Sequence, residues 1–203
     1  DPDFAYVRLL VGGDGSIVDE SDYAYPLSVY GTTVDDPVID SPGGMLMARN
    51  GDVEVTSTST DFQIGSGDCC FEVWYSSTDV YQETVFFGNN VGVEVLYMNH
   101  YDRYFQVFGD GGSGFANQII GTQFTVAEIS TFFNGAPRHV AFVKNGGDIY
   151  GYLNGERHPN TLTSRPTLRS GATGPSLGVQ HVLGYSLSPE GRVDDFRVTI
   201  GVP

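Results

Sequence analysis

Short apolar runs, each closed by a turn signal, recur along the whole chain. The first run, 4–11, ends at the glycine- and aspartate-rich turn 12–15, and the strongest runs cover 69–75 and 191–200. Further runs cover 27–30, 34–39, 45–47, 53–55, 84–87, 91–98, 104–108, 117–122 and 177–185. Runs this short, with no room for helices between them, are typical of antiparallel strands. The pattern predicts an all-β fold, a two-sheet antiparallel sandwich with little or no helix.

The pattern of the segment 138–156 predicts that it lies at the centre of this sandwich. Its first half, 139–143, is apolar or aromatic at nearly every position, whereas 149–153 alternates tyrosines with aliphatic residues or glycine. Strands of this kind are covered on both faces. Asn145-Gly146-Gly147 and Asn154-Gly155 supply residues that adopt positive φ in tight turns. We therefore expect two consecutive hairpins at the centre of a jelly-roll sandwich.

Four other segments interrupt the strand pattern. Gly31 separates the runs 27–30 and 34–39, and Asn50-Gly51-Asp52 is a further hairpin signal. The segment 124–133 is the only helical candidate, and 157–175 is polar and contains proline. We expect a helical turn in the first of these two long segments and a loop in the second.

Length and charge narrow the class of protein. A chain of 203 residues fits one large all-β domain, so we expect a single domain over 1–203, and its start at Asp-Pro suggests a module of a longer protein. Asp and Glu number 25 against 10 Lys and Arg, for a net charge of −15. This charge repels phosphates, which argues against nucleic acid and anionic membranes, but it tolerates neutral sugars and cations. No apolar run approaches the ~20 residues of a membrane-spanning helix, so membrane insertion is not expected.

The two cysteines, Cys69 and Cys70, are adjacent in the sequence. Neighbouring side chains of a strand point to opposite faces, which argues against a disulfide between them. Two free thiols suggest folding in a reducing compartment.

The sequence lacks the motifs of the enzymes that share such folds. Sandwich glycosidases place two acids on one face of a strand, and neither Glu72 nor Glu94 has such a partner. No G-x-S-x-G elbow occurs, and the histidines at 100, 139, 158 and 181 lack metal-ligand spacing. We expect no catalytic activity, no metal and no cofactor.

Aromatic residues are the candidates for ligand binding. Trp74, the only tryptophan, shares a face with Cys70 and Glu72, opposite Cys69, Phe71 and Val73. A second set surrounds a polar turn and consists of Tyr97, His100, Tyr101 and Tyr104. Sugar-binding sites use such rings because the apolar face of a sugar stacks on them. The alternative is that these rings pack between the sheets.

Asp194 is in register with Phe196, Val198 and Ile200, which predicts that it points inward. A buried carboxylate needs partners, so it is either a structural acid that accepts hydrogen bonds from loop amides or a calcium ligand. We do not predict a metal site, because no clustered D-x-D-x-D loop occurs.

Several segments in order resemble one family. The family pattern "GDG" is matched at 13–15, "DF…GTGDFTIEFW" at 61–74, "HVAV…LYVDG" at 139–155 and "IDDVRIT" at 193–199, and Gly43-Gly44 precedes a further match. The chain is similar to concanavalin A-like, laminin-G-like jelly rolls of the kind found in bacteriophage structural proteins. Two departures are Asn154, where the family usually has Asp, and Cys69-Cys70, where it has Phe-Thr. The family also implies that Asp14, Asp19 or Asp68 is a candidate calcium ligand.

The resemblance implies a non-enzymatic module on the virion surface, in a capsid decoration, a fibre or a tail-associated protein. Its partners would be other virion structural proteins and, in the adhesin form, cell-surface polysaccharide; a homo-oligomer fits the same role. An alternative is a secreted bacterial lectin-like domain or hydrolase accessory domain that binds carbohydrate. A second alternative is a purely structural ornament of the particle.

Overall fold

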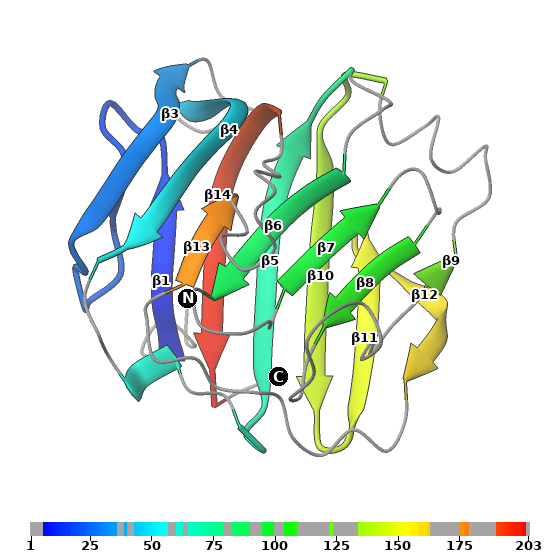
Figure 1. Ribbon diagram of the computed structural model, residues 1–203. Helices are drawn as coiled ribbons and strands as arrows, with labels where there is room; N and C mark the ends of the chain where they lie inside the picture. Colours follow the sequence, from blue (N-terminus) through cyan, green and yellow to red (C-terminus); the bar gives the residue numbers. More distant parts are fainter. Residues whose placement is uncertain are drawn as a thin grey trace.

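In the computed structural model (Figure 1), the chain forms a 14-stranded antiparallel sheet that folds over on itself. The structure describes residues 6–35, 39, 43–56, 60–62, 65–78, 83–89, 95–99, 104–108, 122–123, 134–162, 175–178 and 190–201. The elements are β1 (Val7–Gly12), β2 (Val18–Asp19), β3 (Leu27–Asp35), β4 (Gly44–Val55), the 3-10 turn η2 (Thr60–Phe62), β5 (Cys69–Ser76), β6 (Glu83–Asn89), β7 (Val95–Asn99), β8 (Tyr104–Phe108), β9 (Thr122–Gln123), β10 (Arg138–Asn145), β11 (Asp148–Leu153), β12 (Glu156–Leu162), β13 (Pro175–Gly178) and β14 (Gly191–Ile200). Within these described ranges, no helix has the length and apolar character needed to cross a membrane.

The strands lie in two layers. The order β12-β11-β10-β5-β14-β4-β13-β6-β7-β8-β9 runs through both, with β1 added beside β14 and β3 beside β4. Figure 1 shows β6, β7 and β8 in front of β5, β10 and β11. The predicted fold class, an antiparallel β-sandwich, is therefore confirmed.

Strand β4 joins the two layers and corrects one expectation. It runs unbroken through Asn50-Gly51-Asp52, where the sequence predicted a hairpin, and its first half pairs with β14 while its second half pairs with β13. A Cβ on Gly51 would lie 2.7 Å from the carbonyl oxygen of Gly31, and one on Gly178 would lie 2.6 Å from that of Gly51. These glycines allow three backbones to approach closely where β4 changes layer.

Strand β3 is continuous where two strands were expected. It covers Leu27–Asp35, and its pairing with β4 shifts between Tyr30 and Thr32, at Gly31, whose φ is 59°. Gly31 therefore forms a bulge within one strand and does not separate two strands.

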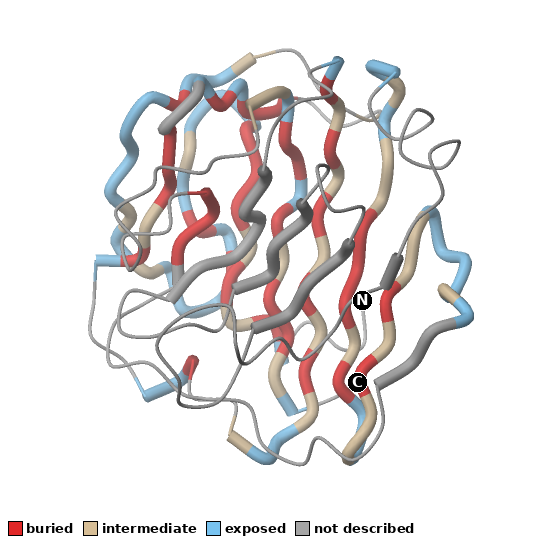
Figure 2. The backbone as a smooth tube through the Cα atoms, turned by 45° about the vertical axis from the view of Figure 1, so that its right-hand side comes forward, coloured by how far each residue is buried: buried red, intermediate tan, exposed pale blue. Residues whose placement is uncertain are grey.

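The core lies between the two layers. Strand β5 alternates buried with half-buried residues along its whole length, with Phe71, Val73 and Tyr75 on the buried side. Figure 2 shows the same alternation as red and tan segments on the neighbouring strands. The fully buried residues of β14, Val193, Phe196 and Val198, belong to the same cluster.

The predicted central hairpins are confirmed. Strand β10 pairs with β11 from Val140–Leu153 to Asn145–Asp148, and β11 pairs with β12. Asn154 and Gly155, with φ values of 52° and 79°, form the second turn as expected. Residues 156–162 form the strand β12, so the prediction of a loop that begins at 157 was wrong for 157–162.

The helical turn predicted at 124–133 lies outside the described residues. Both cysteines are free thiols.

Two buried polar side chains anchor loops to this core. Lys144, the only lysine of the sequence, is 1% exposed, and its Nζ donates to the carbonyl oxygens of Ser66, Gly67 and Gly146 at 2.8–3.0 Å. Asp19 accepts hydrogen bonds from the amides of Leu10, Ser21 and Tyr25. Each side chain satisfies backbone groups that would otherwise lose their partners when buried.

Candidate functional site

The side of β5 that faces away from the core carries the candidate site. We use the name outer face for the surface formed by the residues of β5 that point away from the core and by the residues in register with them. The latter lie on β14 and β10, which pair with β5, and on β11, which pairs with β10. Because residues directly opposite each other on antiparallel strands share a face, the register arranges the outer face in rows. One row is Asp194–Trp74–His139, the next is Arg197–Glu72–Ala141–Tyr152, and the third is Thr199–Cys70–Val143–Tyr150.

A shallow groove of about 560 Å³ opens at the Trp74 end of the outer face. The ring of Trp74 is half-buried and packs at 5.2 Å and 48° against the ring of His139. The groove is lined by Trp74, Pro137, Arg138, His139, Asn154 and Gly155. An aromatic ring flanked by polar groups at the edge of a sheet is the kind of surface that a sugar or another amphipathic ligand can occupy.

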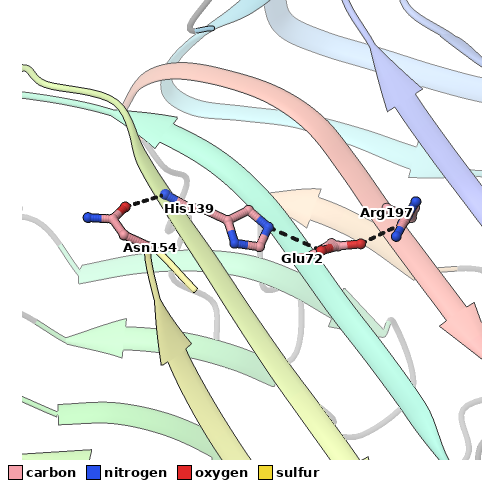
Figure 3. Close-up of polar contacts among 4 residues, drawn as sticks. All are labelled: Glu72, His139, Asn154 and Arg197. Carbon is pink, nitrogen blue, oxygen red and sulfur yellow. Dashed lines mark hydrogen bonds and ion pairs between the residues drawn. The ribbon is translucent and has the colours of Figure 1, made fainter. Parts of the chain in front are cut away.

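The backbone of His139 is held from both sides by Asn154 (Figure 3). The amide of Asn154 donates to the carbonyl oxygen of His139 at 2.8 Å. The amide of His139 donates to Oδ1 of Asn154 at 2.9 Å, the bond drawn between these residues in Figure 3. The turn at Asn154-Gly155 makes this possible, because a positive φ at Asn154 brings its side chain back beside the start of β10.

The imidazole of His139 is held by Glu72, which also contacts Arg197 (Figure 3). Nε2 of His139 lies 3.1 Å from Oε2 of Glu72, and Nε of Arg197 donates to Oε1 of the same carboxylate. Burial by itself would raise the pKa of the Glu72 carboxyl, but the hydrogen bond from His139 and the charge of Arg197 outweigh it and lower the pKa. Glu72 is therefore ionised at neutral pH and fixes the ring that packs against Trp74.

The structure separates the predicted ligand-binding residues into two places. Trp74 lies on the outer face of β5, while Tyr97 and Tyr104 belong to β7 and β8, in the other layer of the sandwich. His100 and Tyr101 lie outside the described residues. A ligand-binding role for the four residues Tyr97, His100, Tyr101 and Tyr104 therefore stays a prediction.

The groove contains residues that sequence reasoning treated as scaffold. Arg138, His139 and Asn154 belong to the central hairpin, and nothing in their spacing points to Trp74. The signal that would have found them is the pairing of β10 with β5, which sets His139 opposite Trp74. A strand's partner is a long-range choice that the periodicity of one strand does not contain.

A second and larger depression, of about 780 Å³, lies between β4 and the ends of β5 and β14. Its described lining includes the hydroxyl-bearing residues Thr33, Ser76, Ser77 and Thr78, together with Glu190 and Arg192. None of the described residues that line it carries an aromatic ring for a sugar to stack on, so the Trp74 groove is the better candidate for a sugar.

Asp194 is buried, at 0% exposure, but the register argument for it was wrong. The pairing of β14 with β5 shifts between Asp194 and Arg197, and Asp194 pairs with Trp74 and not with a core residue. The extra residue is Asp195, whose φ is 46° and whose amide donates to Oδ1 of Asp194 at 3.0 Å. Asp194 thus accepts a hydrogen bond from a backbone amide, which is the contact expected of the structural acid, one of the two alternatives given for this residue.

Acidic side chains gather near this bulge. Burial raises the pKa of Asp195, and the charges of Asp194 and Asp14 raise it further; burial and then the charge of Asp14 do the same for Glu20. Among the described residues, no group of three or more His, Cys, Asp or Glu side chains is arranged to hold a metal ion. We call Asp14, Glu20, Asp194 and Asp195 the acidic corner.

Comparison with known proteins shows the fold. No protein-family model matches the chain, and no curated protein matches it by sequence. Among solved structures, it is similar to the binding domain of Paraclostridial Mosquitocidal Protein 1, with a TM-score of 0.71 and 15% identity over 97% of this chain and 49% of that one. The chain therefore spans about half the length of that neighbour.

Two further solved structures have the same fold. Domain 4 of an extracellular arabinanase of Geobacillus stearothermophilus, in complex with arabinotriose, matches with a TM-score of 0.63 and 15% identity over 96% of this chain and 92% of that one. The binding domain of botulinum neurotoxin DC, in complex with SialylT, matches with a TM-score of 0.64 and 14% identity over 97% and 48%. The chain is thus a jelly-roll-like β-sandwich similar to domains named as binding domains.

Proposed function

We propose that this domain is a non-enzymatic carbohydrate-binding module that holds a glycan in the groove beside Trp74. The observation that carries the proposal is the half-buried indole, packed against His139 at the edge of a groove with polar walls. The apolar face of a pyranose or furanose ring stacks on an indole, while the flanking polar groups bond its hydroxyls.

The network behind the groove supports the proposal. His139 is fixed through its backbone by Asn154 and through its ring by Glu72, and Glu72 is fixed by Arg197. A ring that is already immobilised loses little conformational entropy when a ligand stacks on its neighbour. Weak contacts of a shallow groove therefore yield more net affinity than they would on a mobile surface.

Structural neighbours support the ligand class in a general way. The arabinanase domain was solved with arabinotriose, and one of the neurotoxin binding domains with SialylT. At 14–15% identity these likenesses show a shared fold, and the choice of a glycan for this chain rests on the groove itself.

The absence of catalysis is part of the proposal. A general acid in a glycosidase needs a carboxyl whose pKa is raised toward neutrality, whereas the pKa of Glu72 is lowered by His139 and Arg197. Glu72 also has both oxygens engaged by these partners, which suits a structural role.

The setting of the module is a proposal with two forms. In the first, the domain is a surface module of a bacteriophage virion, bound to other virion proteins, and reaches polysaccharide on the host. In the second, it is a lectin-like or accessory domain of a secreted bacterial protein, and only this second form finds support in the arabinanase and toxin neighbours. In both forms residues 1–203 act as one module, and several copies would compensate for weak single-site binding.

A glycan array probed with the purified domain tests the function. We expect binding to one related group of glycans, with affinity lost at least tenfold in Trp74→Ala, since each stacked ring contributes on the order of 1–2 kcal/mol. Tyr30→Ala is the matched control, because Tyr30 is 70% exposed on β3, outside the groove. A blank array, or equal binding by Trp74→Ala and the unmodified domain, contradicts the proposal.

A further inference from the structure

The groove beside Trp74 differs in charge from the molecule as a whole. Its lining includes Arg138 and His139, and none of the described residues that line it carries a carboxylate. The sequence as a whole carries 25 acidic against 10 basic residues. A cationic lining in so acidic a chain points to a ligand that carries negative charge.

The hydrogen-bonding character of the lining points the same way. The guanidinium of Arg138 can only donate hydrogen bonds. Oδ1 of Asn154 already accepts from the amide of His139, so the Nδ2 group of Asn154 is the part of this side chain that can donate to a ligand. In Figure 3 this amide nitrogen lies on the side of Asn154 away from His139. Arg138 and Asn154 therefore offer N–H groups to a ligand in the groove, and the ligand supplies the acceptors for them.

The acid next to the groove does not change this balance. The carboxylate of Glu72 is shared between His139 and Arg197, and its pKa is lowered by them against the effect of burial. Sites for neutral sugars use carboxylates to accept hydrogen bonds from hydroxyls, because hydroxyls donate as well as accept. Here the nearby carboxylate is engaged by its own partners.

We propose that the groove selects acidic glycans, in which a sugar carboxylate, as in uronic or sialic acids, is bound by Arg138 and the Asn154 amide while a sugar ring stacks on Trp74. This inference rests on the proposed carbohydrate-binding function and specifies its ligand class. Charge-assisted hydrogen bonds from a guanidinium are about twice as strong as neutral ones, which is the physical basis of the selection. The net charge of −15 opposes it only weakly, since exposed charges are screened beyond about 8 Å at physiological ionic strength.

Matched ligands and matched variants test the inference. The ligands are trigalacturonate and sialyllactose, each compared by calorimetry with the same compound after its carboxylates are converted to primary amides. We expect at least one acid to bind about tenfold more tightly than its amide, as one charge-assisted bond in place of a neutral one predicts. Arg138→Gln should abolish this preference, and Arg8→Gln, whose guanidinium packs over Tyr23 outside the groove, should retain it.

The outcomes separate this inference from the proposed function. Equal affinity for acid and amide, or an array that returns only neutral glycans, overturns the acidic-ligand inference and leaves carbohydrate binding intact. A preference that survives in Arg138→Gln overturns the inference too, because another group must then bind the carboxylate. Failure of both ligand pairs together with a blank array overturns the proposed function itself. Thermal unfolding of each variant, with a midpoint equal to that of the unmodified domain, shows that a loss of binding is local.

Discussion

Strand β14 carries two charged regions that behave in opposite ways. At Arg197 it borders what we call the paired region, Glu72 with His139 and Arg197, in which every charge has a partner. A few residues earlier, at Asp194 and Asp195, it enters the acidic corner, where carboxylates adjoin one another. The pKa of Glu72 is lowered in the first region, and the pKa values of Asp195 and Glu20 are raised in the second.

The difference teaches that burial alone does not decide what a charge contributes. Burial is the largest single influence on the pKa of all three carboxyls, and by itself it would raise each pKa. In the paired region the hydrogen bond from His139 and the charge of Arg197 reverse that effect, whereas in the acidic corner neighbouring acids add to it. The same strand therefore contains one stabilising and one destabilising electrostatic arrangement at neutral pH.

The linkage between protons and folding gives these arrangements opposite pH dependence. Because the folded pKa of Glu72 lies below its unfolded value, its contribution to stability is present at neutral pH and is lost as the pH falls through the folded pKa. For Asp195 and Glu20 the folded pKa lies above the unfolded value. Their contribution is present below the unfolded pKa and is lost as the pH rises through the folded pKa.

The largest expected effect comes from removing the fully buried amine of Lys144, on the core side of β10. Lys144→Met leaves the carbonyls of Ser66, Gly67 and Gly146 without their donor, so we expect the free energy of unfolding to fall by about 3 kcal/mol. Urea unfolding at pH 7 measures this. Arg192→Met, which removes an exposed ion pair with Asp35, is the control and should cost less than about 1 kcal/mol. Equal losses in both variants would contradict the role of the three carbonyls.

Breaking the paired region itself is expected to have a smaller effect. Glu72→Gln removes the charge that holds His139 and Arg197, and we expect a loss of about 1.5 kcal/mol at pH 7. The deficit should shrink toward zero as the pH falls below the folded pKa of Glu72, because the carboxyl of the unmodified domain is then neutral, like the amide of the variant. Urea unfolding at pH 7 and at pH 3 measures both values, and a deficit independent of pH would show that the lost charge is not its cause.

Relieving the acidic corner should stabilise the domain slightly. Asp195→Asn keeps a residue type that tolerates the positive φ at this bulge and removes one of the mutually repelling charges. We expect a gain of about 0.5 kcal/mol at pH 7 that disappears in acid. Asp22→Asn, at an exposed acid outside the corner, is the matched control. The comparison of the two regions fails if Asp195→Asn is less stable than the unmodified domain at pH 7.

The smallest effect is expected at Cys70, next to the paired region on the outer face. Burial, together with the charge of Glu72, raises the pKa of its thiol to about 12, so little reactive thiolate forms at pH 8. We expect iodoacetamide to leave both cysteines unmodified in the folded domain and to modify both after unfolding in urea. Mass spectrometry counts the added groups, and rapid labelling of the folded domain would contradict the buried environment.

Much of the architecture follows from local patterns. The alternation of β5, the closing strand β14 and the turns at Gly146 and Asn154-Gly155 all lie where the sequence places them. These features depend on a period of two and on residues that adopt positive φ, and both are local properties. The same reasoning wrongly predicted a hairpin at 50–52, where Gly51 instead allows backbones from distant strands to approach closely.

The candidate site was predicted less well. Trp74 was singled out from its position opposite the core residues of β5, and the structure places it at the groove. Its neighbours His139, Arg138 and Asn154 come from a segment more than 60 residues away, brought there by the pairing of β10 with β5. The face on which Asp194 lies was mispredicted because a bulge shifts the register of β14 by one residue, and no local pattern marks where the bulge occurs.

By itself the sequence determined that the chain alternates, where it turns and that Trp74 faces away from the core residues of its strand. Those outcomes depend on side-chain period and on backbone φ, which each short segment carries within it. Only the tertiary structure decided which strands are neighbours, where β4 changes layer and that His139, Glu72 and Arg197 share the outer face with Trp74. These depend on pairing between segments far apart in the chain, whose register is chosen by packing of the whole core.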